Sequence, residues 1–322
     1  MILKQLNLIK KIIRSIIIIT AFIGMQRSAL AQIQKVIVKV EFKSDNSYEF
    51  SYEKDVPGNY TLAIILKNLK NAYNPHFKEV ISNNQGSLFS LTPIDSKKRI
   101  TFSYNYSYIQ GIINPKVNKE FTYLLPFQKG KEIKVHDVKN LANAILDKSL
   151  PENWKMYQFE GYYLDSIFAS RKGVVINIID NNTSDLEAYY SGKKNSITIE
   201  HLDGSFANYS GFQKNSILVK EGQTVYPSTF LGLVNQSNKD HLNSLIFSVY
   251  YLVNDEPNRK YRNSSFKYVK RTSYINPYFF TSKGVEQLLQ FNNYIADFNK
   301  ELILREFTRR EKKQLKKNQI KI

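Results

Sequence analysis

Length, composition and charge limit the classes of protein to which this chain can belong. The chain has 322 residues, of which 42% are hydrophobic and 13% aromatic, so it can bury a core and is not intrinsically disordered. Its net charge of +18 includes five charges in the first 31 residues and about six in residues 300–322. The rest shows no ordered basic and aromatic groove, so nucleic-acid binding is not favoured. The absence of cysteine excludes disulfides and thiolate metal ligands.

Residues 1–31 resemble a cleavable signal peptide. Basic residues precede an apolar run at 16–23, and Ala29-Leu30-Ala31 gives a small-x-small cleavage pattern before Gln32. The alternative is an uncleaved anchor, but the run is shorter than the roughly 18–20 residues of a spanning helix. We therefore expect a periplasmic or secreted protein with no membrane span after cleavage.

Residues 32–127 are predicted to form a β-sandwich domain. Apolar and polar residues alternate through Val36–Phe42, and further strand-like runs follow at spacings of eight to twelve residues. Tyr104, Tyr106 and Tyr108 share one face of a predicted strand. They either form a platform for stacking on sugars or peptides, or simply suit a half-buried strand, and the second reading is favoured.

Residues 128–153 are predicted to be a Lys-rich linker. It contains a short helix over 138–150 that Pro151 ends. His136 in this segment, and His76 before it, are each predicted to be solvated rather than ligating, because each stands alone in a polar stretch.

Residues 154–281 are predicted to be an antiparallel β core. Within Asn195–Val253, short alternating runs are separated by turns at Asp203-Gly204 and Glu221-Gly222. Four groups of residues here resemble the lysostaphin-type (LytM-like) zinc metallopeptidases, which cut peptide cross-links in bacterial cell walls. These groups are Ile199-x-His201-x-Asp203-Gly204-Ser205, Val219-x-x-Gly222-x-x-Val225, Phe230-x-Gly232 and Leu245-x-Phe247.

The resemblance implies a mainly β fold, with a β core similar to a duplicated hybrid motif barrel. Residues 32–127 also resemble the amino-terminal β domain that precedes the peptidase-like core in exported proteins of Bacteroidetes. The phrases that suggest this are Tyr52-Glu53-Lys54-x-Val56-Pro57-Gly58 and Thr92-Pro93-Ile94-Asp95. This match implies no function for the domain.

The same resemblance indicates that the peptidase chemistry is lost. The family positions for zinc ligands and catalytic histidines fall on five residues here: Trp154, Gln158, Gly211, Ser244 and Ile246. A catalytic zinc needs three protein donors of nitrogen, carboxylate or thiolate type. We therefore expect no catalytic residue and no zinc cofactor, although active relatives use zinc.

A relocated metal site is the alternative to this loss. It would use His201 and His241 with Asp203 or Asp240, since imidazole with carboxylate is ordinary zinc chemistry. Nothing in the spacing brings these four groups together, so the metal-free reading is favoured.

Without metal, the former substrate groove is predicted to bind rather than cut. Its residues are Trp154, Gln158, Gly211, His241, Ser244 and Ile246, with Tyr162, Tyr163 and Tyr251 adding aromatic surface nearby. The first hypothesis is an exported, catalytically inactive peptidase-like protein that binds peptidoglycan or a cell-wall hydrolase through this groove. The alternatives are a divergent zinc endopeptidase with displaced ligands and an envelope structural or adhesion module. Residues 282–322 are predicted to be a basic helical tail.

Overall fold

A computed structural model gives the fold, in two compact units at Met1–Lys35 and Val36–Ile322. The structure describes residues 35–137, 153–161, 165–182, 194–235, 243–253 and 271–317. The predicted signal peptide, the predicted helix at 138–150, Tyr162, Tyr163, Asp240 and His241 lie outside these ranges. Within the described ranges, no helix is long and apolar enough to cross a membrane.

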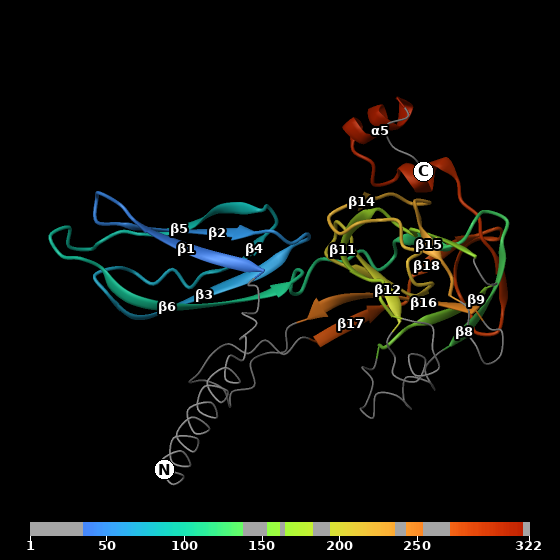
Figure 1. The fold of residues 1–322 in the computed structure, drawn as a ribbon, viewed down its shortest axis with the longest axis horizontal. Coiled ribbons are helices and arrows are strands. Elements are labelled where there is room, and N and C mark those ends of the chain that lie inside the picture. Colours follow the sequence, from blue (N-terminus) through green and yellow to red (C-terminus); the bar gives the residue numbers. More distant parts are fainter. Residues whose placement is uncertain are drawn as a thin grey trace, which may run out of the picture. The chain divides into compact units, whose positions relative to one another are not determined.

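The first part of the second unit is the predicted β-sandwich, built from two three-stranded antiparallel sheets (Figure 1). Their orders are β1-β2-β5 and β4-β3-β6, with the bounds β1 Val36–Phe42, β2 Tyr48–Lys54, β3 Tyr60–Lys70, β4 Lys78–Ile81, β5 Gln85–Leu91 and β6 Thr101–Gln110. Residues from both sheets form one buried cluster that includes Phe50, Leu62 and Ile81. In β1, Val36 and Val38 are buried while Ile37 is 44% exposed, so the period-2 pattern sets which side faces the core.

The tyrosines of β6 belong to this core. Tyr104, Tyr106 and Tyr108 are partly buried against the sandwich cluster, while Asn105, between the first two, is exposed. The ring of Tyr104 meets Phe50 edge to face with 5.5 Å between centroids. The structure thus agrees with the reading in which these tyrosines fill a half-buried strand.

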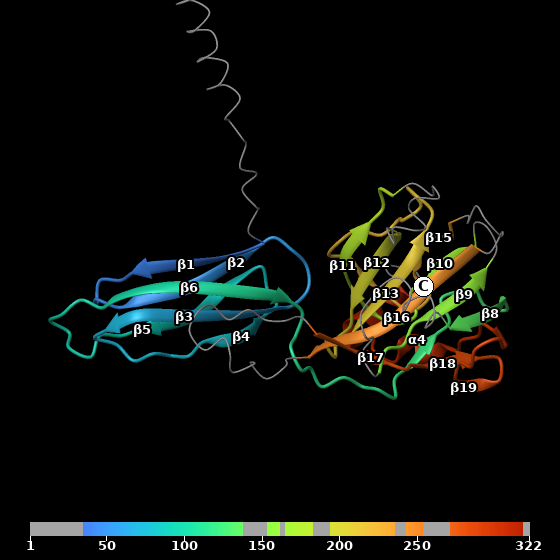
Figure 2. The ribbon, with the colours of Figure 1, turned by 90° about the horizontal axis from the view of Figure 1, so that it is seen from below.

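The second part of the unit centres on a nine-stranded sheet with antiparallel neighbours. Its order is β14-β11-β12-β13-β16-β9-β8-β20, with β17 pairing β16 off this path, and Figure 2 shows the strands from β11 to β8 following one another. The bounds are β8 Glu132–Asp137, β9 Tyr157–Gly161, β11 Gly173–Ile179, β12 Asn195–Glu200, β13 Phe206–Phe212, β14 Thr224–Val225, β16 Asn243–Val253, β17 Arg271–Ile275 and β20 Asn293–Ile295.

One face of this sheet is the core of the second part. Phe159, Tyr209 and Phe247 are fully buried on it; Phe159 and Phe247 pack with Phe279, and Tyr209 packs with Phe247. Two small sheets accompany it: β10 with β15, and β7 with β18 and β19, in which β18 pairs β7 in parallel. Their bounds are β7 Thr122–Leu124, β10 Ser166–Phe168, β15 Phe230–Leu233, β18 Tyr278–Thr281 and β19 Gly284–Gln287. The mainly β fold expected from the sequence is confirmed.

Two predicted segments contain strands of these sheets. Strand β8 lies in the predicted linker and pairs with β9, because buried Ile133 and Val135 alternate with polar residues inside the Lys-rich stretch. Strands β19 and β20 lie in the predicted tail, and β20 pairs with β8. In the Lys-rich segment, the composition concealed a short period-2 pattern, whereas the run Phe279–Val285, in which β19 begins, predicts part of a closing pair of strands.

The carboxy-terminal helices pack on the second part rather than extending from it. Helix α4 (Lys300–Leu304) and helix α5 (Arg309–Lys316) flank Phe307, which packs with Leu302 and Leu124 in a small apolar cluster. Helix α5 begins with a capping box between Thr308 and Glu311. The apolar residues Phe298, Leu302 and Phe307, which recur at near-helical spacing in the sequence, suggest that the predicted helical tail docks on the protein, and the cluster with Leu124 shows this contact.

Candidate functional site

The register of the central strands places two of the predicted site residues opposite each other. Gln158 of β9 and Ile246 of β16 are Cα partners, and Ile246 is also the partner of Ser210 on β13. Their neighbours Phe159 and Phe247 point into the core, so Gln158 and Ile246 lie on the other side of the sheet. Both are partly exposed. We call this side of β13, β16 and β9 the outer face.

Gly211 and Ser244 meet beside this pair. Gly211 has φ +112°, and a Cβ on it would lie 2.5 Å from the carbonyl oxygen of Ser244. An L-residue at this position would be both strained and blocked by backbone. Ser244 is itself the Cα partner of Glu160. The residue that the sequence comparison aligned with a catalytic histidine is thus a glycine that the local backbone requires.

The other predicted groove residues are placed differently. Trp154 precedes β9, is 8% exposed, and packs its ring against Tyr274 at 6.2 Å between centroids. Tyr251 is partly buried against the core cluster. His241 lies outside the described residues. The structure therefore brings together Gln158, Gly211, Ser244 and Ile246 of the predicted set, and shows Trp154 as a packed side chain.

The outer face does not fit a catalytic zinc. An isoleucine and a glycine supply no donor, and a glutamine and a serine are poor ones. Among the described residues, no group of three His, Asp or Glu side chains is arranged to hold a metal ion. The donor chemistry at these four positions thus gives no support for a metal-dependent reaction step.

His136 is a residue whose environment the sequence prediction missed. Strand β8 makes it the Cα partner of Gln158, at the end of the same row of side chains. Its Nε2 lies 2.7 Å from Oε2 of Glu160, and the two side chains are 25% and 32% exposed. The prediction that His136 is simply solvated is wrong, because a strand carries it onto the sheet beside a carboxylate. His76, by contrast, is exposed.

A second cluster of charges surrounds Arg171. Its guanidinium, 3% exposed, binds Asp203 at 2.9 Å and Glu306 at 2.7 Å, and it lies 3.8 Å from the ring centre of Phe121. Burial would raise the pKa of Asp203, but Arg171 and hydrogen bonds from Ser205 outweigh it and hold that pKa below its usual value. This carboxylate already has its cation and is not a free metal ligand.

His201, like Asp203, is held by contacts within the protein. Its Nδ1 lies 2.7 Å from the carbonyl oxygen of Lys172, and its Nε2 is buried with no hydrogen-bond partner in the described part of the chain. Burial lowers the pKa of His201 to about 3, and the charge of Arg171 acts in the same direction. The neighbouring His201 and Asp203 therefore point at different partners. A relocated metal site that includes Asp240 or His241 remains a prediction, since both lie outside the described residues.

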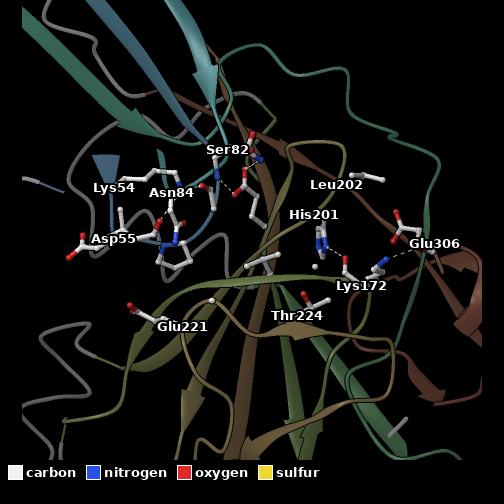
Figure 3. A pocket seen from close by; sticks show the side chains of 18 of the residues that line it. Lys54, Asp55, Ser82, Asn84, Lys172, His201, Leu202, Glu221, Thr224 and Glu306 are labelled. Atoms are coloured by element: carbon white, nitrogen blue, oxygen red, sulfur yellow. Dashed lines mark hydrogen bonds between the residues drawn. The ribbon is translucent and has the colours of Figure 1, made fainter. Parts of the chain in front are cut away.

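A cavity of about 660 Å³ borders His201 (Figure 3). Its polar lining residues are largely bonded to one another: Glu200 accepts from the backbone N and from Nδ2 of Asn59, both at 2.8 Å, and Lys54 donates to the carbonyls of Val56 and Gly58 at 3.0 Å. Burial raises the pKa of Glu200. Because these bonds hold the polar lining residues to one another, these groups are not free to bind a ligand.

Comparison with known proteins gives structural matches only. No family model matches the chain, and no curated protein matches it. Among solved structures, Csd3 of Helicobacter pylori matches at 12% identity over 88% of this chain and 78% of its own, with a TM-score of 0.30. Pseudoalterin, described as an M23 metalloprotease from the deep sea, matches at 15% identity over 48% of this chain and 95% of its own, with a TM-score of 0.29.

A third match is described as a putative glycyl-glycine endopeptidase lytM from Ruminococcus gnavus. It has 11% identity over 50% of this chain and 58% of its own, with a TM-score of 0.29. The structures found are thus of the kind that the sequence motifs resemble. At these identities and TM-scores, nothing about the activity, ligand or partner of this chain follows from them.

Proposed function

We propose that this chain is an exported, peptidase-like binding protein that recognises peptidoglycan or a cell-wall hydrolase through the outer face of its β core. The observation that carries the proposal is the register of β9 and β16. It supports the alignment by which Gln158 and Ile246 take the places of zinc ligands, because residues that replace ligands of one metal should lie close together, as cross-strand partners on one face do.

The chemistry of this face suits binding better than cleavage. Ile246 offers an apolar contact between the polar side chains of Gln158 and Ser210. A few polar groups around an apolar centre are typical of recognition surfaces. Polarising an amide carbonyl would need a metal or a positioned set of donors, and these positions supply neither.

Gly211 makes the loss of chemistry difficult to reverse. A histidine there would place its Cβ within 2.5 Å of the Ser244 carbonyl oxygen, so the backbone around β16 would have to move. The backbone of the site therefore leaves no room for a histidine at this position, although the strands that form the site remain in place.

The test is co-sedimentation of the full chain with purified cell-wall sacculi, compared between Ile246→Asp and a matched Ile179→Asp control. Ile179 is a 40% exposed strand residue at the far end of β11, so it controls for an added charge on an exposed apolar position. We expect Ile246→Asp to weaken binding about tenfold or more, since an apolar anchor that is an interface hot spot commonly costs about 2 kcal/mol or more on truncation. Equal binding by both variants would contradict the proposal.

A hydrolase partner is tested in the same experiment with wall hydrolases added in place of sacculi. Dialysed protein is also analysed for metal, and we expect no stoichiometric zinc. About one zinc per chain, together with cleavage of wall peptides, would favour the divergent endopeptidase instead.

A further inference from the structure

Phe291 is held in an unfavourable conformation that exposes its ring. It lies in the turn between β19 and β20 with φ +63°, in the left-handed region that bulky side chains rarely adopt. Its backbone N–H donates to the carbonyl oxygen of Val135 at 2.7 Å, which fixes the turn against β8. Yet the side chain is 63% exposed. Packing therefore does not account for an aromatic residue at this position, and such outliers concentrate at functional sites.

The exposed ring stands next to the His136–Glu160 pair. The rings of Phe291 and His136 meet edge to face, with 5.8 Å between centroids and an interplanar angle of 83°. On its other side, His136 makes the 2.7 Å contact with Glu160. An aromatic face, an imidazole and a carboxylate thus lie side by side, all partly exposed.

This group continues the outer face. His136 is the Cα partner of Gln158, and Glu160 is the partner of both Ser244 and Lys134. Side chains at such positions share one face of the sheet. The group therefore borders the four residues through which we propose that the wall or a hydrolase is bound.

The backbone at this place offers nothing to an extended peptide. Strand β9 is paired on both sides, by β16 and β8, and β8 is paired by β9 and β20. Phe291 and Asn292 extend the pairing along β8 to Val135. A peptide that adds to a sheet needs an open edge. Recognition at this place must therefore come from side chains alone.

The three side chains match a sugar ring. The face of an aromatic ring is negative and attracts the partly positive C–H groups on the flat side of a pyranose. A carboxylate is a strong acceptor for hydroxyl groups. In the tautomer that donates Nε2–H to Glu160, Nδ1 of His136 is a further acceptor. Stacking with neighbouring acceptors suits a neutral molecule that has one apolar face and several hydroxyls on its rim.

We propose that Phe291, His136 and Glu160 form a saccharide subsite at the edge of the outer face, which takes the glycan rather than the peptide part of the wall. This inference rests on the proposed function and narrows its ligand. Phe291 supplies the stacking surface, and Glu160 and His136 bind hydroxyls of the same sugar.

The experiment uses the full chain and tetra-N-acetylchitotetraose, a chain of N-acetylglucosamine without peptide, titrated by calorimetry. Phe291→Gly removes the ring and relieves the backbone strain. We expect its affinity to fall about tenfold or more, while its unfolding temperature stays equal or rises. Leu289→Gly is the matched control, because Leu289 is 64% exposed in the same turn, and its affinity should not change. Glu160→Gln should also weaken binding, with an unchanged circular dichroism spectrum.

The outcomes separate this inference from the proposed function. Sedimentation with sacculi but no binding of the oligosaccharide overturns the saccharide subsite and leaves the proposed function standing. Loss of both sacculus and oligosaccharide binding overturns the saccharide subsite and the peptidoglycan form of the proposed function, and leaves only the hydrolase form, which the hydrolase experiment tests. Equal oligosaccharide affinity of Phe291→Gly and Leu289→Gly overturns the role of Phe291. If a free stem peptide binds in a Phe291-dependent manner and the oligosaccharide does not, the subsite takes peptide and the inference is wrong.

Discussion

Replacing Arg171 by methionine should destabilise the second part of the unit far more than a typical surface substitution. Methionine keeps most of the side-chain volume but removes the charge and all hydrogen bonds. It leaves the carboxylates of Asp203 and Glu306, which are only 13% and 15% exposed, without their cation. Removing one partner of a buried ion pair typically costs about 3–5 kcal/mol, because the remaining charge is left poorly solvated. The contact of the guanidinium with Phe121 adds to the loss.

The expected value for Arg171→Met is therefore about 3–5 kcal/mol of unfolding free energy. Glu306→Gln should cost less, about 1–3 kcal/mol, because Arg171 keeps Asp203. In the double variant the two costs should not add, since the second change removes a charge that the first has left unpaired. Arg171→Lys should be intermediate, because an ammonium group cannot reproduce the two-pronged contact with Glu306.

Urea unfolding followed by tryptophan fluorescence measures this effect in the correct part of the chain. Trp154 is the single tryptophan, and it packs beside Tyr274 in the second part, so the sandwich contributes no signal. A loss below about 1 kcal/mol for Arg171→Met, or full additivity with Glu306→Gln, would refute the view that Arg171 neutralises two buried carboxylates.

Two further predictions concern pH and backbone shape. Because the folded state lowers the pKa of His201 to about 3, the unfolded chain binds a proton here below its ordinary pKa of 6.5 and the folded chain does not. The free energy of unfolding should therefore fall as the pH drops from about 6.5 towards 3. His201→Gln should flatten the plot of unfolding free energy against pH between about pH 6.5 and 4.5. An unchanged slope of that plot would contradict the buried neutral imidazole. Gly211→Ala should destabilise the protein by about 2 kcal/mol or more. Gly284→Ala, which has φ +109° but no atom within 4 Å of the added Cβ, should cost distinctly less, and equal losses would show that the Ser244 carbonyl oxygen is no obstacle.

The sequence predicted those features that depend on local pattern. Alternation of apolar and polar residues identified β1, and ordered motifs aligned Gln158 and Ile246, which the register then placed opposite each other. Both signals are carried by residues that are close in the chain or fixed in spacing.

Features that depend on distant partners could not be predicted in this way. His136 looked solitary because Glu160, its partner, lies 24 residues away on another strand. Phe291 gave no signal, because a left-handed backbone conformation is usually marked by glycine or asparagine. Trp154 was placed in the groove by counting along the alignment, and its packing against Tyr274 depends on β17, which is more than 100 residues away.

The contact between Arg171 and Glu306 also has a consequence for the order of folding. These residues are 135 positions apart in the chain, so strands β11, β12 and β13 leave the ribosome well before Glu306. Until then Arg171 has only Asp203, and the apolar surface that Leu302 and Phe307 later cover is open to solvent. Closing such a long loop is slow compared with local pairing. We therefore expect the docking of Leu302 and Phe307 to follow the pairing of the core strands, so that a chain in which they are not yet docked has an incomplete core.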